Sequence, residues 1–282
     1  MRKTFATIFS LFLYAGLCAQ GLGWVVEQTN DRNLIAAPAL GDVEPTVFEA
    51  SINPFKFFSL DSGNAGIELA FKSVLRMLNS RSCPIYTPSY MPSVSAYKTL
   101  KRYPDSTLLV ARLTLGHHSN GQNGPFYTGQ GDINTVNGNF ATDFIRIALI
   151  NEIKGAGFVQ AGFEQHLNIE NCRQLVGMYG LSRLYVGFQS HYLELGRGHF
   201  LKAGCSNTWI SGRLDQARPL DINARLVASL MLTYRPAFAG GFALFAQYYR
   251  GQDYYNINFT ERLSFMRLGI CLEPSALPRL AS

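Results

Sequence analysis

A histidine and a serine stand two residues apart at the end of a strand-like segment, and they have the residue types of a nucleophilic hydrolase. The segment from Thr107 to Ser119 alternates with period two, which is typical of a β-strand because successive side chains point to opposite sides. His117 and Ser119 therefore share one face with Leu113 and Leu115. Because serine becomes nucleophilic when a neighbouring base takes its proton, the pattern predicts acyl-transfer chemistry on an apolar face.

A catalytic histidine also needs a third group that fixes its tautomer, and the next predicted strand offers two. In the segment 139–149, Ile145 and Ile147 lie on the apolar face, and Asp143 and Asn139 share their parity. We predict that Asp143 orients His117. Asn139 is the second choice, because an amide oxygen can also accept a hydrogen bond from the imidazole.

The residues around Ser119 also predict an oxyanion site. Asn120-Gly121 is a turn signal that would free backbone N–H groups, so we expect those of Ser119 and Gly121 to stabilise a developing negative charge. His118 has the opposite parity and is expected to face the interior. The competing interpretation is structural, since a His-x-Ser at a strand end also arises by chance and both residues are common at barrel rims.

The composition describes a membrane barrel better than a soluble enzyme. Of the 282 residues, 47% are hydrophobic, 13% aromatic and only 16% charged, whereas soluble domains carry about 25% charged residues. No stretch after the N-terminus is long and apolar enough for a membrane-spanning helix. The net charge of +6 is dispersed along the chain, which excludes a nucleic-acid-binding patch.

Three regions follow from the pattern along the chain. Residues 1–19 have the basic start, apolar middle and small residues of a secretory signal peptide. A lipoprotein acylated at Cys18 is the weaker alternative, because Leu17 stands where a small residue is expected. Residues 20–44 are polar and contain Pro and Gly, which predicts an irregular N-terminal arm. Residues 45–282 are predicted to form the barrel.

The barrel region holds eleven predicted strands with the alternation of membrane-spanning β-segments. They are expected at 46–58, 66–77, 86–98, 106–118, 140–152, 156–168, 181–194, 197–209, 222–235, 240–251 and 258–272. Because bacterial single-chain barrels normally have an even number of strands, we expect an all-β, antiparallel transmembrane barrel of about twelve. The His117 end opens into a long loop, so it is expected at the extracellular side of a Gram-negative outer membrane, toward the outer leaflet.

Three stretches resemble outer membrane phospholipase A, a family of twelve-stranded barrels with a Ser-His-Asn site on the lipid-facing wall. The first ends in His117-His118-Ser119-Asn120-Gly121, which resembles the family's catalytic His-x-Ser-Asn-Gly. The second is Ala243–Leu272, which resembles the last two strands and their loop, and the third is Gly66–Phe71, which resembles an early strand.

The resemblance implies a calcium-dependent hydrolase that cleaves phospholipid acyl esters with A1 and A2 specificity and is activated by homodimerisation. It makes His117 the base and Ser119 the nucleophile, with the oxyanion bound by the backbone at Ser119 and Gly121 and helped by a calcium-bound water.

The chain departs from the family after Gly121. The loop is longer and lacks the family's Ser-Arg-Ser-Trp-Asn run, so the catalytic asparagine has no counterpart in the motif, and Tyr127 falls near the calcium-binding serine. Thr128, Asp132 and Asn134 offer the hard oxygen ligands that calcium prefers, although no spacing rule selects them.

Two other functions compete with this prediction. The first is a non-catalytic barrel with a porin-like or structural role. A wide channel is disfavoured if the interior is packed by the arginines predicted to point inward, Arg112, Arg146 and Arg267. The second is a lipid A deacylase, another barrel with a His/Ser site. That family has fewer strands and a site nearer its C-terminus, so the chain length and the position of His117 disfavour it.

Overall fold

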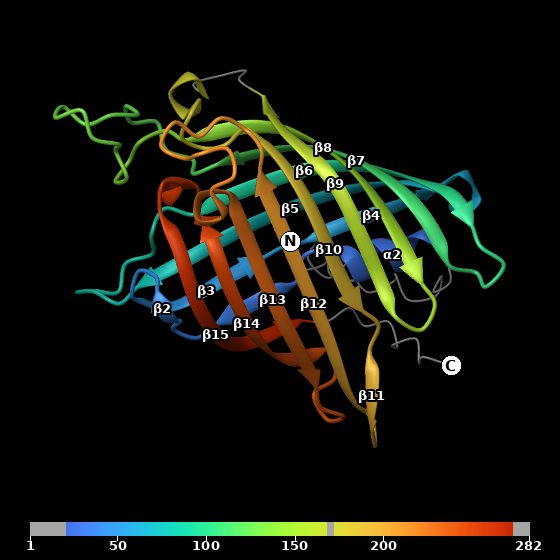
Figure 1. The fold of residues 1–282 in the computed structure, drawn as a ribbon. Helices are drawn as coiled ribbons and strands as arrows, with labels where there is room; N and C mark the ends of the chain where they lie inside the picture. The colour runs from blue at the N-terminus through green and yellow to red at the C-terminus, as the bar shows by residue number, and fades with distance from the viewer. Residues whose placement is uncertain (1–20, 168–171, 273–282) are drawn as a thin grey trace, which may run out of the picture.

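The computed structural model describes residues 21–167 and 172–272, and these fold into a β-barrel (Figure 1). The predicted signal peptide lies outside the described residues. The helical elements are α2 (Leu22–Thr29), α3 (Ile222–Arg225) and the 3₁₀ turns η1 (Asp61–Gly63), η2 (Cys172–Leu175) and η3 (Asn256–Asn258). The strands are β1 (Asn33–Ala36), β2 (Leu40–Asp42), β3 (Thr46–Ile52), β4 (Phe55–Leu60), β5 (Ala65–Leu78), β6 (Ser89–Arg102), β7 (Leu108–Ser119), β8 (Ala141–Ile153), β9 (Gly157–Leu167), β10 (Ser182–Ser190), β11 (Leu193–Gly196), β12 (His199–Ile210), β13 (Leu226–Arg235), β14 (Phe242–Gln252) and β15 (Arg262–Leu272).

The strands close into one antiparallel ring of twelve positions, in the order β1, β3, β5, β6, β7, β8, β9, β10, β12, β13, β14 and β15. Strand β1 closes the ring, since Leu34 is paired with Cys271 of β15 on one side and with Ser51 of β3 on the other. The shorter β2, β4 and β11 pair with β15, β5 and β12. The predicted all-β barrel of about twelve strands is confirmed.

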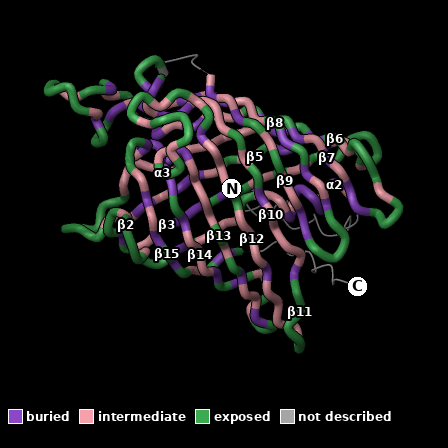
Figure 2. The backbone as a smooth tube through the Cα atoms, viewed as in Figure 1, coloured by how far each residue is buried: buried purple, intermediate pink, exposed green. Residues whose placement is uncertain are grey.

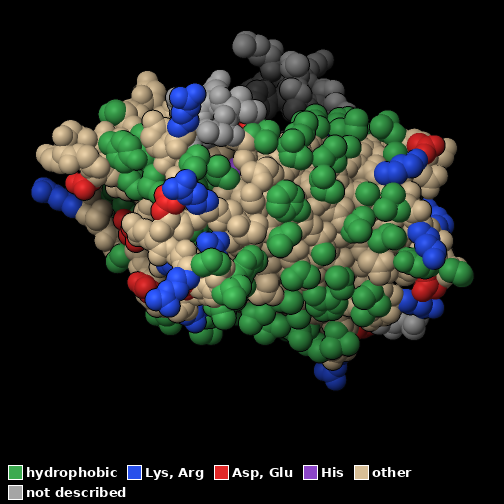
Figure 3. All heavy atoms as spheres, turned by 45° about the horizontal axis from the view of Figure 1, so that its top comes forward, with side chains coloured by type: hydrophobic (Ala, Val, Ile, Leu, Met, Phe, Trp, Pro, Cys, Tyr) green, Lys and Arg blue, Asp and Glu red, His purple; other side chains and the backbone are tan. Residues whose placement is uncertain are grey.

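The wall is apolar outside and polar inside, as the period-two pattern requires. On β7 the outward Leu113 and Leu115 are 45% and 54% exposed, whereas the inward Arg112 and Thr114 are buried. A similar alternation runs along much of β5, β8 and β15, whereas β12 and β13 are mostly of intermediate exposure (Figure 2). Hydrophobic side chains spread over the middle of the outer wall, and the charged side chains gather toward its two ends (Figure 3). This distribution fits a wall that faces lipid.

The segment predicted to be an irregular arm contains regular structure. Its strand β1 belongs to the ring of twelve, and it is the strand that the eleven predicted ones lacked. The segment holds α2 and the short strands β1 and β2. No helix of the described chain is long and apolar enough to span a membrane. Helix α2 lies inside the barrel (Figure 1), where Trp24 and Val25 pack on Val110 of β7 and Ile150 of β8.

Polar residues of the interior connect opposite sides of the wall. Lys202 of β12 donates to Gln28 of α2 at 2.9 Å, so the helix is also held by a strand three positions beyond β8 in the ring. Near the other end, Arg76 of β5 forms buried ion pairs with Glu49 and Asp253 at 2.8 and 2.6 Å. The lumen is therefore occupied by a helix and by cross-barrel ion pairs.

Candidate active site

Strands β7 and β8 place the predicted catalytic residues side by side on the outer wall. The two strands pair over eleven positions, and His117 lies directly opposite Asp143. Both belong to the outward column that continues with Leu115 and Ile145, which face each other one pair farther along the outer face. The register follows from the alternation, because a slip of one residue would turn the apolar column into the lumen.

The Asp143 carboxylate lies within hydrogen-bond distance of the imidazole. His117 Nδ1 is 2.8 Å from Asp143 Oδ1, and the two side chains are 43% and 38% exposed. In the tautomer that donates from Nδ1, this contact leaves Nε2 free to accept a proton. Asn139, the second predicted partner, precedes β8 in the loop, and its N–H donates to the Gly124 carbonyl. The structure therefore brings Asp143, and not Asn139, to His117.

Ser119 is the last residue of β7 and shares the outward parity of His117. It pairs with Tyr90 of β6 on one side and Ala141 of β8 on the other. Among the described residues no hydrogen bond joins Ser119 Oγ to His117. Such contacts in other enzymes often tighten only when substrate binds, so the shared face is the relevant observation.

Gly121 leaves the strand in a conformation that only glycine adopts easily. Its φ is +67°, and a side chain here would meet the Tyr90 ring at 3.2 Å. Within the described chain its N–H donates to no acceptor. The Ser119 N–H lies in the sheet between β6 and β8. Of the two predicted oxyanion donors, Gly121 is the one that leaves a backbone N–H without a partner.

Asn120 secures the loop that follows. Its buried side chain donates from Nδ2 to the Gly138 carbonyl at 2.8 Å, and its Oδ1 accepts from the Phe140 N–H at 3.2 Å. These two bonds join the start of the long loop to its end. Asn120 therefore fixes the point at which β7 gives way to the loop, directly after Ser119.

Two of the three predicted calcium ligands, Thr128 and Asn134, use their side-chain oxygens within their own loop. Thr128 Oγ1 accepts from the N–H groups of Gln130 and Asp132, both at 3.3 Å. Asn134 Oδ1 accepts from two backbone N–H groups, and its Nδ2 donates to the Pro125 carbonyl. Calcium takes six to eight oxygen ligands, and the side-chain oxygens of Thr128 and Asn134 already accept hydrogen bonds within the turn. The described residues contain no cluster of three or more His, Cys, Asp or Glu that would hold a metal.

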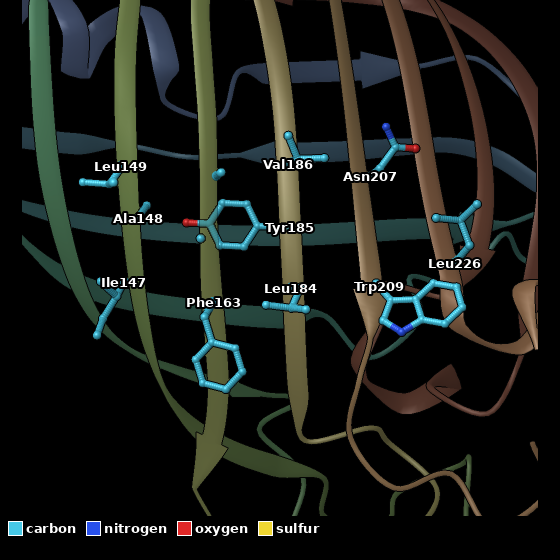
Figure 4. Close-up of a pocket in the computed structure, with 12 residues that line it drawn as sticks. Ile147, Ala148, Leu149, Phe163, Leu184, Tyr185, Val186, Asn207, Trp209 and Leu226 are labelled. Atoms are coloured by element: carbon cyan, nitrogen blue, oxygen red, sulfur yellow. The ribbon is translucent and has the colours of Figure 1, made fainter. Parts of the chain in front are cut away.

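An apolar hollow of about 640 Å³ lies on the same outer wall. It starts at Ile147 on β8, in the outward column of Asp143, and crosses β9 and β10 to Trp209 and Leu226 (Figure 4). Asn207 is the polar side chain that projects among these residues. The hollow is thus an uneven apolar surface beside the site, of a kind that hydrocarbon chains can follow.

Comparison with known proteins yields a structural likeness without a sequence match. No family model and no curated protein matches the chain. Outer membrane phospholipase A of Escherichia coli shares 18% identity, with a TM-score of 0.59 over 88% of this chain and 96% of that one. An active-site mutant of the same enzyme also shares 18% identity, with a TM-score of 0.59 over 86% of this chain and 90% of that one. The Salmonella typhi outer membrane phospholipase dimer with bound calcium shares 16% identity, with a TM-score of 0.58 over 86% of this chain and 90% of that one. The chain therefore shares the barrel fold of outer membrane phospholipase A.

Proposed function

We propose that this protein is an outer-membrane phospholipase that hydrolyses phospholipid acyl esters, with the A1 and A2 positions as its targets. The observation that carries the proposal is the 2.8 Å contact between His117 Nδ1 and Asp143 Oδ1 on an apolar outer wall. A base oriented by a carboxylate, two residues from an outward serine, is the arrangement that acyl transfer requires. An outward site suits a substrate that is itself part of the membrane.

In the proposed reaction, Ser119 Oγ attacks the ester carbonyl carbon while its proton passes to His117 Nε2. Asp143 stabilises the imidazolium, and the Gly121 N–H donates to the oxyanion. When the intermediate collapses, the bond to the lysophospholipid oxygen breaks and His117 returns the proton to it. Water, activated by the same histidine, then hydrolyses the acyl-serine and releases the fatty acid.

The serine is tested by Ser119→Ala in the refolded barrel. We expect fatty-acid release from phospholipid–detergent micelles to fall by a factor on the order of 10³ or more, because the nucleophile is gone. Ser206→Ala is the matched control, since this serine lies on β12 with the inward parity of Lys202. A Ser119→Ala barrel that keeps wild-type activity overturns the proposal.

Calcium dependence and homodimerisation are separate proposals, suggested by the calcium-bound Salmonella dimer. The oxygens of Thr128 and Asn134 are engaged in their own turn. We therefore expect Thr128→Ala to keep the wild-type response to added calcium and to EDTA. A calcium response lost in this variant, with activity in EDTA unchanged, would show that the loop does bind the ion. Cross-linking in bilayers, with and without calcium, measures the dimer.

A further inference from the structure

The loop between β14 and β15, residues 253–261, folds inward and reaches the back of the strand that carries the candidate site. Tyr255, Asn256 and Ile257 at its centre are 0%, 3% and 1% exposed. A connection between strands is normally exposed, since buried backbone needs partners. The burial of this loop therefore calls for a reason, and its contacts supply one.

The start of the loop is fixed to β5. Arg76 donates to both oxygens of Asp253, from Nη1 at 2.6 Å and from Nη2 at 2.8 Å. This two-pronged geometry sets the orientation of the carboxylate as well as its position. The guanidinium carbon also lies 4.4 Å from the centre of the Tyr255 ring. Burial raises the pKa of the Tyr255 hydroxyl, so it stays protonated and donates to the Tyr86 carbonyl at 3.2 Å.

The middle of the loop is attached to the peptide that precedes Ser119. Asn256 Nδ2 donates to the His118 carbonyl at 3.3 Å, and the Asn256 N–H donates to Ser89 Oγ, also at 3.3 Å. Ser89 Oγ is in turn 2.6 Å from His118 Nε2. The carbonyl that Asn256 holds belongs to the peptide bond between His118 and Ser119. A contact from the lumen thus reaches the backbone of the candidate nucleophile.

The end of the loop packs against both ends of the long loop that follows Ser119. The Phe259 ring lies 5.4 Å from that of Phe140 and 6.4 Å from that of Phe126. Aromatic pairs at these separations contribute about 0.5–1.5 kcal/mol beyond the area they bury. Residues 253–261 therefore support the catalytic strand and its loop from behind.

We propose that Asn256 is a positioning residue of the hydrolase, acting through the His118–Ser119 peptide to set Ser119 and Gly121 against His117. The inference rests on the proposed function. The outer side of the site faces lipid and offers no protein framework, so the support must come from the lumen. A displacement of about 1 Å in such a site can lower the rate by about 100-fold.

The test compares Asn256→Ala with Asn258→Ala in the refolded full-length barrel. Asn258 lies in the same turn, but its side chain accepts from the Tyr86 hydroxyl at 3.2 Å, and within the described chain no hydrogen bond joins it to β7. We expect Asn256→Ala to lower kcat by about 10- to 100-fold with KM unchanged. Its Ser119 should react more slowly with a sulfonyl fluoride by a similar factor. Asn258→Ala should match the wild type in both.

Equal losses in the two variants, or wild-type kcat and sulfonylation in Asn256→Ala, overturn the positioning role. If Asn256→Ala does not refold, Ser89→Ala gives the same readouts, since it removes both the acceptor of the Asn256 N–H and the contact with His118 Nε2, and leaves the Asn256 side chain in place. The proposed function fails separately, if Ser119→Ala stays active. If activity depends on Ser119 but not on Asn256, the proposed hydrolase function stands and the positioning role of Asn256 is overturned.

Discussion

At the scale of single residues, the candidate site depends on one cross-strand pair. His117 and Asp143 are direct neighbours in the register of β7 and β8. Parity alone identified the pair from the sequence, because both residues continue an apolar column that has to face outward. Parity cannot give the torsion of a side chain at a strand end, so the lack of a bond from Ser119 to His117 was not predictable.

The His117–Asp143 contact can be tested by removing the carboxylate. We expect Asp143→Ala to lower kcat by about 10²- to 10⁴-fold, since the imidazole loses its orienting partner. The melting temperature should barely change, because an exposed ion pair is worth at most about 1 kcal/mol. Asp143→Asn should retain more activity than Asp143→Ala, since its amide oxygen can accept from Nδ1–H.

The matched control is Asp61→Ala, which breaks the exposed 2.6 Å ion pair with Lys98 away from the site. Its kcat should equal that of the wild type. Wild-type kcat in Asp143→Ala would remove the carboxylate from the mechanism.

At the scale of elements, the strands were predictable and the inward-folded pieces were not. Long alternating strands such as β7 and β8 carry a clear period, whereas β1 and β2 have four and three residues, too few for the pattern to be recognised. Helix α2 has eight residues and contains Gly23, Val25 and Val26, which are poor helix formers. Its packing inside the barrel stabilises it, and that contact has no local sequence signal.

The loop after Ser119 depends on Asn120, whose side chain joins its two ends. Asn120→Ala leaves the Gly138 carbonyl and the Phe140 N–H without these partners, at about 1–3 kcal/mol for each buried group. We expect faster proteolysis within residues 121–139 and a lower kcat, because Gly121 loses its fixed position. Gln130→Ala, at the exposed part of the loop, should change neither. Wild-type protease resistance in Asn120→Ala would contradict this role.

At the scale of the whole molecule, the contents of the lumen argue against the porin-like alternative. Helix α2 packs on β7 and β8 inside the barrel and also bonds to Lys202 of β12, and the Arg76 ion pairs lie toward the other end of the lumen. The packed helix and the buried ion pairs occupy lumen space that a wide, water-filled channel would need.

We therefore expect the wild-type barrel in planar lipid bilayers to show no large, long-lived conductance steps. Deleting residues 22–29 should increase the current, since it removes the helix from the lumen. Large steps from the wild-type protein would instead favour the porin-like alternative.

If the proposed hydrolysis takes place at His117 and Asp143, their outward position has a consequence for the medium of the reaction. A soluble hydrolase builds the dry surroundings of its reacting atoms from its own side chains on all sides. This wall supplies only one side, and the hydrocarbon of the leaflet must supply the other. The physical state of the surrounding bilayer, its thickness and fluidity, then becomes part of the catalytic apparatus. The rate should respond to the lipid phase even when the ester being cleaved stays the same.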